Sequence, residues 1–215
     1  IYREGDTWRE RRSPRGQTAP GELYDSLVER LERLSPDVVR VLRLAALSGN
    51  SAEKDLLQQA SGLPRVRFMR AVGVLTRIHG VLHQIDEHCE FTSDQVAQTV
   101  RRRIGSAAPA LHACLADAIE TIRQEGSAKW TEALAEHRLK AGDVERALPS
   151  LMEAGEHCAR FGSHDRALHF YERAVEEIQK LGTPSGALGT RMRVLRKVAE
   201  SRAALKAWSA SEEAY

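Results

Sequence analysis

The side chains that could bind a metal or catalyse a reaction are scattered in this sequence. His83, His88 and Cys89 lie close together, but their spacing matches no common zinc pattern and a fourth ligand is missing. The sequence contains no Gly-x-x-x-x-Gly-Lys-Ser/Thr phosphate-binding loop, no Gly-x-Ser-x-Gly elbow and no His-Glu-x-x-His motif. We therefore expect that this chain has no catalytic residues, holds no metal and binds no cofactor by itself.

Arginines gather in one predicted helix, which begins at Pro64 and ends at Gly80. They are Arg65, Arg67, Arg70 and Arg77, and a further run follows at Arg101, Arg102 and Arg103. A basic helix of this kind could contact DNA in the major groove. Against DNA, acidic residues at 86, 87 and 90 would repel phosphate, and no Asn or Gln lies among the arginines to read adenine. We expect this surface to meet protein, nucleotide or solvent, with DNA the less favoured partner.

The second half of the chain repeats a pattern of small and large apolar residues. The turn at 141–143 is followed by Ala147, Leu151 and Ala154, and the turn at 161–165 is followed by Ala167, Tyr171 and Ala174. Alanines at this spacing allow antiparallel helices to approach closely, which is typical of helical-repeat proteins that bind partners. The pattern therefore favours a binding function over a catalytic one.

Two stripes of side chains would face a partner if the helices at 144–160 and 187–205 are the inner helices of such a stack. The stripes are Met152, Glu156 and Arg160 on the first helix, and Arg193, Arg196 and Glu200 on the second. Mixed charge is also typical of a solvated helix face, so both interpretations stay open. We expect a protein or peptide to bind somewhere in the groove between these helices.

Composition indicates a mainly α-helical protein with two modest domains. The chain has 215 residues, of which 42% are hydrophobic and only 5% aromatic. A net charge of +2 gives no overall attraction to nucleic acid or an anionic membrane. Three widely spaced cysteines form no disulfide framework and favour the reducing cytoplasm. No apolar stretch is long enough to span a membrane.

The first half of the chain predicts a winged-helix domain. Residues 1–20 are expected to hold a small hairpin and a linker, and helices are expected at about 21–34, after Pro36, after a capping Ser51 and after Pro64. A two-stranded hairpin follows at about 81–91, and Thr92 and Gln95 fit a capping box for the next helix. Three or four helices followed by a hairpin predict a winged helix over 21–105.

The second half predicts helices at about 110–124, 129–141, 144–160, 164–181 and 187–205, with another beginning near Trp208. A break is expected at 182–186. Short connections place such helices antiparallel, so an α-α superhelix like that of tetratricopeptide (TPR) repeats is expected over 106–215. Because the sequence opens at Ile1 and stops at Tyr215 inside a helical pattern, we expect it to be a piece of a longer protein.

The order of these parts resembles the region after the ATPase core in bacterial STAND-type regulators (signal-transduction ATPases with numerous domains). Residues 1–8 look like the tail of the ATPase module, 27–42 like its junction with a winged helix, and 134–147 like the first TPR-like repeats. The resemblance implies that ATP or ADP binds in an upstream module, and that this chain contacts that module in cis.

One position departs from the pattern of that family. There the helix after the wing often begins with an aromatic residue, a basic residue, His and Asp, and the His can contact the phosphates of ADP. Here the segment is Phe91-Thr92-Ser93-Asp94. Serine could donate a hydrogen bond to a phosphate but carries no charge. Ser93 is therefore either a nucleotide-sensing residue or, with Thr92, simply part of a helix cap.

These observations predict a non-catalytic regulatory part of a multidomain signalling ATPase, which binds a protein or another signal through its TPR-like repeats. The alternative is a DNA-binding transcriptional regulator that uses the arginine-bearing helix of its winged helix and senses a signal through the repeats.

Overall fold

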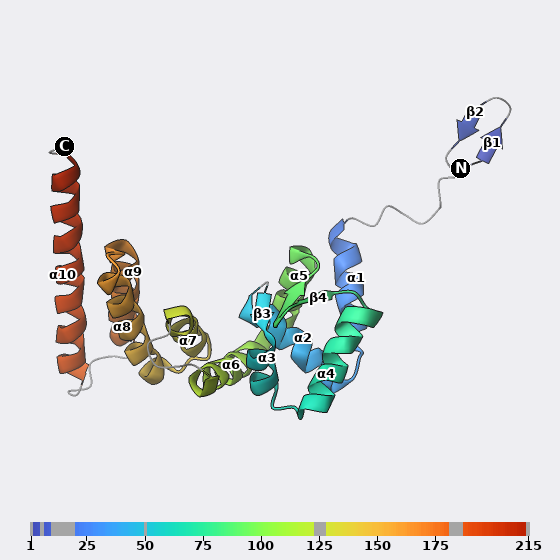
Figure 1. Ribbon diagram of the computed structural model, residues 1–215, viewed down its shortest axis with the longest axis horizontal. Coiled ribbons are helices and arrows are strands. Elements are labelled where there is room, and N and C mark those ends of the chain that lie inside the picture. Colours follow the sequence, from blue (N-terminus) through green and yellow to red (C-terminus); the bar gives the residue numbers. More distant parts are fainter. Residues whose placement is uncertain are drawn as a thin grey trace.

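The computed structural model describes residues 2–4, 7–9, 20–49, 51–122, 128–180 and 187–213. They form a mainly helical protein with two small antiparallel sheets. The helices of the first half cluster together, and from α6 to α10 the helices continue along the length of the molecule (Figure 1). In the described ranges, no helix is long and apolar enough to cross a membrane.

The first sheet is the hairpin expected near the start of the chain. β1 (Tyr2–Glu4) pairs antiparallel with β2 (Thr7–Arg9), with Arg3 opposite Trp8. The prediction of a hairpin here is confirmed, and the predicted linker at 13–16 lies outside the described residues.

Five helices and one sheet form the unit that follows. The helices are α1 (Pro20–Glu32), α2 (Pro36–Ser48), α3 (Lys54–Ser61), α4 (Arg65–Gly73) and α5 (Asp94–Ile104). Pro36 occupies the start of α2, and Gly62 ends α3 with the left-handed φ of 65° that favours glycine. A short π-helical segment, η1 (Val74–Ile78), continues α4. The apolar faces of these helices meet around Leu42, Leu57 and Phe68, none of which is more than 1% exposed.

The second sheet has three strands, one more than the sequence predicts. β3 (Ser51–Glu53), β4 (Leu82–Ile85) and β5 (His88–Phe91) lie in the order β3-β5-β4, all antiparallel. Ser51 belongs to β3 and pairs with Glu90 of β5, and the N-cap residue of α3 is Glu53. The predicted role of Ser51 as the cap of that helix is therefore wrong. The physical reason is that β5 has a free edge, and pairing with β3 satisfies its backbone groups.

The predicted capping box at 92–95 is also wrong. α5 begins at Asp94, its N-cap residue is Ser93, and no side chain makes a capping hydrogen bond there. Thr92 still belongs to the hairpin, because its N–H and its hydroxyl both donate to the Val81 carbonyl, at 3.0 and 3.3 Å. The hairpin therefore holds the residue that the sequence pattern assigned to the helix.

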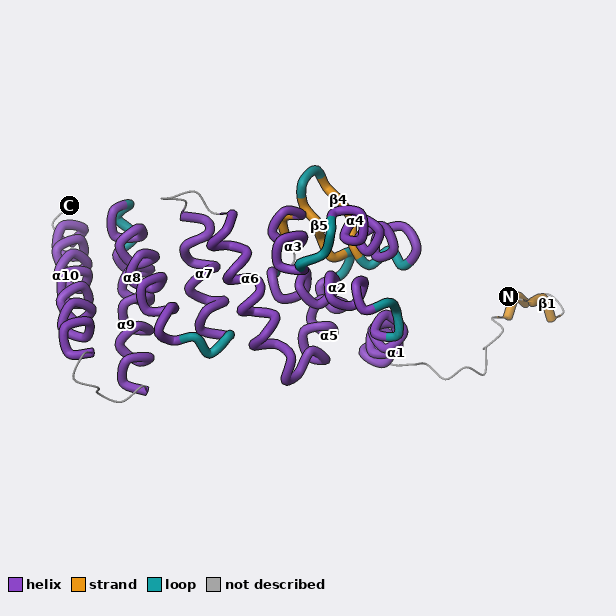
Figure 2. The backbone as a smooth tube through the Cα atoms, turned by 90° about the horizontal axis from the view of Figure 1, so that it is seen from below, coloured by secondary structure: helices purple, strands orange, loops and turns teal. Residues whose placement is uncertain are grey.

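The second half is a stack of antiparallel helices. They are α6 (Ala108–Ile122), α7 (Ala128–Lys140), α8 (Val144–Arg160), α9 (His164–Lys180) and α10 (Ala187–Glu213), and a single 3-10 turn, η2 (Gly105–Ala107), leads into α6. Each helix of the stack lies beside the next (Figure 2). α10 runs unbroken past Trp208, so the separate helix predicted there is wrong; no Gly or Pro interrupts 190–213. The predicted break at 182–186 lies outside the described residues.

The alanine pattern marks where these helices touch. Ala147, Ala154, Ala167 and Ala174 are all fully buried, as expected for small residues at close helix contacts. Glycines turn the chain between helices: Gly142 has a φ of 79° and donates its N–H to the Leu139 carbonyl at 3.0 Å.

A buried arginine fastens the first helices of the stack. The side chain of Arg138 on α7 is only 2% exposed, and it forms ion pairs with Glu120 (2.6 Å) and Asp117 (2.9 Å) on α6. It also lies 3.6 Å from Asp143, the residue that caps α8. One guanidinium therefore joins three consecutive helices.

The two halves share α6. Leu115 and Ile119 of α6 are fully buried in the apolar core of the first half, together with residues of α2 and α3. A second core lies between α7 and α10 and contains Leu151, Tyr171 and Val194. α6 lies on the C-terminal side of the predicted boundary at 105, yet its side chains complete the core before it.

Candidate binding groove

A groove runs between α8 and α10, over α9. Its larger cavity measures about 640 Å³, and it is lined by Glu156, Ala159, Arg160, His164, Tyr171, Lys197, Glu200 and Ser201. Because alternate helices of the stack face the same side, α8 and α10 form the walls while α9 supplies the floor. We call this hollow, with the smaller cavity beside it, the α8/α10 groove.

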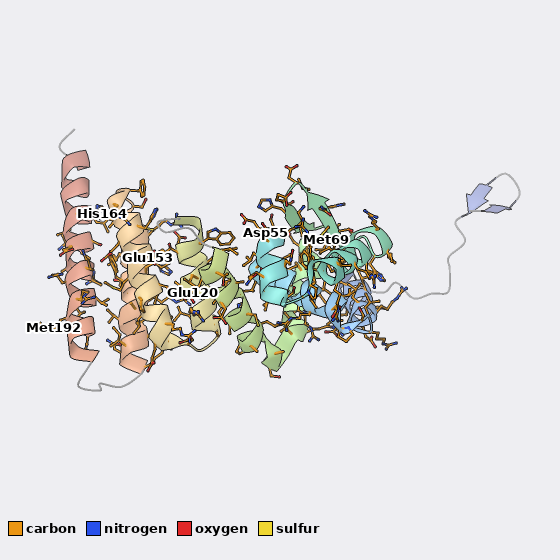
Figure 3. All side chains as sticks on the ribbon, turned by 60° about the horizontal axis from the view of Figure 1, so that its bottom comes forward. Asp55, Met69, Glu120, Glu153, His164 and Met192 are labelled. Carbon is orange, nitrogen blue, oxygen red and sulfur yellow. The ribbon has the colours of Figure 1, made fainter. Side chains whose placement is uncertain are left out.

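The smaller cavity measures about 400 Å³ and is more apolar along one wall. It is lined by Glu145, Leu148, Pro149, Met152, Glu153, Glu156, Arg193 and Val194. Glu156 lines both cavities, so they adjoin along α8. Figure 3 places Glu153 on α8, His164 at the start of α9 and Met192 on α10.

The structure brings together five of the six side chains that the sequence assigned to the two stripes. Three of them line the smaller cavity and three the larger, with Glu156 common to both. Arg196 lines neither cavity, but its guanidinium lies 3.6 Å from the carboxylate of Glu200. Residues of the two stripes thus line one groove, while the inner position of these helices and binding through these residues stay predictions.

Tyr171 forms the floor of the larger cavity. It is 1% exposed, and its ring packs on Gly155, where a Cβ atom would lie 2.3 Å from the ring. Burial raises the pKa of Tyr171 to about 12, and the carboxylates of Glu156 and Glu200 act in the same direction. The hydroxyl therefore keeps its proton and can donate a hydrogen bond. No described residue accepts it.

A second polar atom at this cavity also lacks a partner. The Nδ1 atom of His164 is buried and makes no hydrogen bond within the described part of the chain. Buried polar atoms nearly always have a partner, so one that lacks it invites an external partner or water.

The charges of the groove are only partly neutralised. Lys197 lies 3.2 Å from Glu200, which also pairs with Arg196. Glu156 and Arg160, by contrast, form no ion pair with any described residue. The groove thus offers one carboxylate and one guanidinium, a helical turn apart on α8, to an incoming ligand.

The opposite face of the stack has a cavity of about 410 Å³ between α7 and α9. Here the charges are already paired: Arg166 binds Glu132 and Arg173 binds Glu136, each at 2.6 Å. This face is held together by ion pairs between its own helices, so the α8/α10 groove is the stronger candidate for ligand binding.

The arginine-bearing helix is α4 with η1, and its four arginines differ in their surroundings. Arg67 makes two hydrogen bonds of 2.8 Å to Asp37 at the start of α2, so its guanidinium is occupied. Arg65, Arg70 and Arg77 are exposed, and none of them has an ion pair in the described ranges.

The run at 101–103 serves contacts within the fold. Arg101 donates from Nε to the Ala46 carbonyl at 2.5 Å. Arg102 and Arg103 both lie within 4 Å of Asp25, and Arg103 also pairs with Glu32 at 3.3 Å. These three arginines therefore hold α5 against α1 and α2, and the sequence expectation that they extend the basic surface of α4 receives no support.

Ser93 is half-buried at the start of α5, and its side chain makes no capping bond. Side-chain capping by Ser93 is therefore not observed, and nucleotide sensing stays a prediction.

A pair of histidines escaped the sequence analysis. His112 on α6 and His137 on α7 are 6% and 7% exposed, and their Nδ1 atoms are 2.8 Å apart. Burial lowers the pKa of each to about 4, and Lys140 acts in the same direction. Both rings are therefore neutral at pH 7 and share one hydrogen bond. Twenty-five residues separate them, so only the packing of α6 on α7 reveals the pair.

Metal-ligating side chains do not converge in the described residues, where no three His, Cys, Asp or Glu side chains could hold an ion together. On the hairpin, His83 is exposed opposite Glu90, whereas Cys89 is buried opposite Gln84.

Comparison with known proteins found no family model, no curated protein and no solved structure that matches this chain.

Proposed function

We propose that this chain is a non-catalytic regulatory module, in which a winged-helix domain (21–105) is followed by a TPR-like superhelix (106–215) that binds a protein or peptide segment in the α8/α10 groove. The observation that carries the proposal is the larger cavity, where the buried Nδ1 atom of His164 has no hydrogen-bond partner among the described residues.

The lining of the groove suggests what such a segment contains. Leu148, Pro149 and Met152 give the smaller cavity an apolar wall, with the carboxylates of Glu145 and Glu153 beside it. An apolar side chain next to a basic one would suit this cavity. The larger cavity suits polar groups, because the phenol can donate a hydrogen bond and Arg160 and Glu156 offer unpaired charges.

A regulatory role follows from the connection between the two halves. α6 belongs to the first core, and α7 contributes Leu134 to the first core and Ala135 to the second. Arg138 ties α6 to α7 and α8, so a ligand in the groove lies on a continuous packed path to the winged helix. We propose that the module contacts, in cis, an ATPase module that holds ATP or ADP, as the resemblance to STAND-type regulators implies. DNA binding is the weaker alternative, because Arg67 and the run at 101–103 are engaged within the fold.

The proposal can be tested by selecting displayed random peptides on the full chain and measuring the affinity of enriched peptides by fluorescence polarisation. Arg160→Glu reverses an exposed, unpaired charge in the groove. Arg30→Glu on α1 makes the same change at an exposed residue far from it and serves as the matched control. We expect Arg160→Glu to weaken binding about tenfold or more, and the control to leave it unchanged.

Hydrogen exchange supplies an independent readout. Bound peptide should slow exchange in α8 and α10 and leave α1 unaffected. The groove would be refuted as the binding site if Arg160→Glu left the affinity of the peptides unchanged, or if bound peptide slowed hydrogen exchange only in other helices.

A further inference from the structure

A second surface of the molecule, away from the groove, exposes apolar side chains that need an explanation. Val66 is 72% exposed, Ile78 71%, Ile85 51% and Met69 42%, and all four lie on α4, η1 or β4. Met69 lies at the other end of the array from His164 and Met192 (Figure 3). Val66 and Met69 lie one turn apart on α4, and exposed large apolar residues this close together mark interaction sites.

Helical periodicity defines one outward face. Phe68, Ala71 and Val72 are buried on the inner side of α4. At 100° per residue, the opposite side carries Val66, Met69, Arg70, Gly73 and Arg77. We call this set of five residues the α4 face.

Gly73 lies in the middle of this face and has no structural role within the chain. A Cβ atom added there would meet nothing within 4 Å, and its φ is ordinary for a helix. Glycine inside a helix is less stable than alanine by about 1 kcal/mol. By contrast, the buried helical glycine Gly155 is explained by its contact with the Tyr171 ring, and Gly189 lies in the first turn of α10, where the cost is small. A bare position in an exposed helix allows another molecule to approach the backbone closely.

The charges around this face are uncompensated. Arg65, Arg70 and Arg77 are exposed without an ion pair to any described residue, whereas Arg67 is occupied by Asp37. An apolar centre rimmed by unpaired guanidinium groups complements a surface with apolar side chains flanked by carboxylates.

We infer that the α4 face is a docking site for an acidic amphipathic helix of a partner protein, with Gly73 admitting the close approach of that helix. One observation favours protein over DNA: the exposed apolar side chains of Val66 and Met69 gain nothing from contact with phosphate.

A subtractive selection tests this inference. Displayed helical peptides are enriched on the unmodified chain, and those that also bind Gly73→Trp are removed. A Cβ atom at position 73 meets nothing within 4 Å in the free protein. Circular dichroism and unaltered unfolding confirm that the variant folds. Arg70→Glu is a second variant that changes charge without adding bulk. Peptides that bind the α8/α10 groove also bind Gly73→Trp and are removed by the depletion, so the two sites are separated.

We expect the peptides that remain after the depletion to carry apolar residues spaced three and four positions apart, flanked by Asp or Glu. Gly73→Trp and Arg70→Glu should each weaken their binding about tenfold or more, while Arg160→Glu changes it less than about twofold. The inference is overturned if no peptides distinguish the two proteins, or if those that do are neutral or basic. It is also overturned if a random-sequence DNA duplex binds the chain with an affinity that falls steeply with salt, and if the Gly73→Trp substitution abolishes that binding.

Discussion

The packing of Tyr171 on Gly155 predicts that a single added methyl group destabilises the second core, which lies between α7 and α10. In Gly155→Ala the new Cβ would lie 2.3 Å from Tyr171 Cε1 and 2.8 Å from Cδ1, well inside any normal contact. Alanine gains about 1 kcal/mol over glycine from helix propensity. Overpacking a closed core costs about 1–3 kcal/mol. A buried aromatic ring can move aside less than the end of a flexible side chain, so the clash is relieved only in part. We expect a net loss of about 1–2 kcal/mol in the free energy of unfolding.

Urea unfolding followed by circular dichroism measures this loss, and hydrogen exchange assigns it to α8, α9 and α10. Tyr171→Phe retains the clashing ring carbons and should not rescue Gly155→Ala, whereas Tyr171→Leu removes them and should recover about 1 kcal/mol in a double-mutant cycle.

The same substitution at Gly73 is the matched control, because there the added Cβ meets open space. Gly73→Ala should therefore stabilise the first core by about 0.5–1 kcal/mol. We would reject the packing argument if the two substitutions changed the free energy of unfolding in the same direction, or if the Gly155→Ala protein were as stable as wild type.

Two further predictions concern buried polar groups. Arg138→Ala removes the guanidinium that joins three helices and leaves a cavity, so unfolding should become easier by about 2–4 kcal/mol, and Arg138→Met, which keeps the apolar stem, should lose roughly half of that in the same urea assay. His112 and His137 have a pKa of about 4 in the folded chain and about 6.5 when unfolded, so the unfolded state takes up protons first as the pH falls. Their contribution to stability is complete above pH 6.5 and is lost between about pH 6.5 and 4; His112→Leu combined with His137→Leu should flatten that part of the stability–pH curve, and an unchanged slope would contradict the buried neutral pair.

The sequence predicted most helices because their signals are local. Proline at 36, glycines at 142 and 162 and buried alanines every few residues act within one or two turns, and the ends of α8 and α9 fall within one residue of the prediction. The stripes on α8 and α10 meet at one groove because alternate helices in an antiparallel stack face the same way.

The errors come from contacts between distant segments. The local sequence predicts Ser51 and Thr92 as helix caps. In the structure Ser51 pairs with β5 instead, and Thr92 donates a hydrogen bond to the Val81 carbonyl. The floor of the groove escaped prediction for the same reason: the partnerless His164 Nδ1 and the Tyr171 hydroxyl matter only once α9 lies beneath α8 and α10.

The shared helix α6 has a consequence for how this protein can be divided. A fragment that stops at Gly105 would leave the apolar surfaces of α2 and α3 open to water, because Leu115 and Ile119 normally cover them. Extending it to Ile122 restores that cover. The smallest transplantable piece of the N-terminal half therefore includes the first helix of the stack.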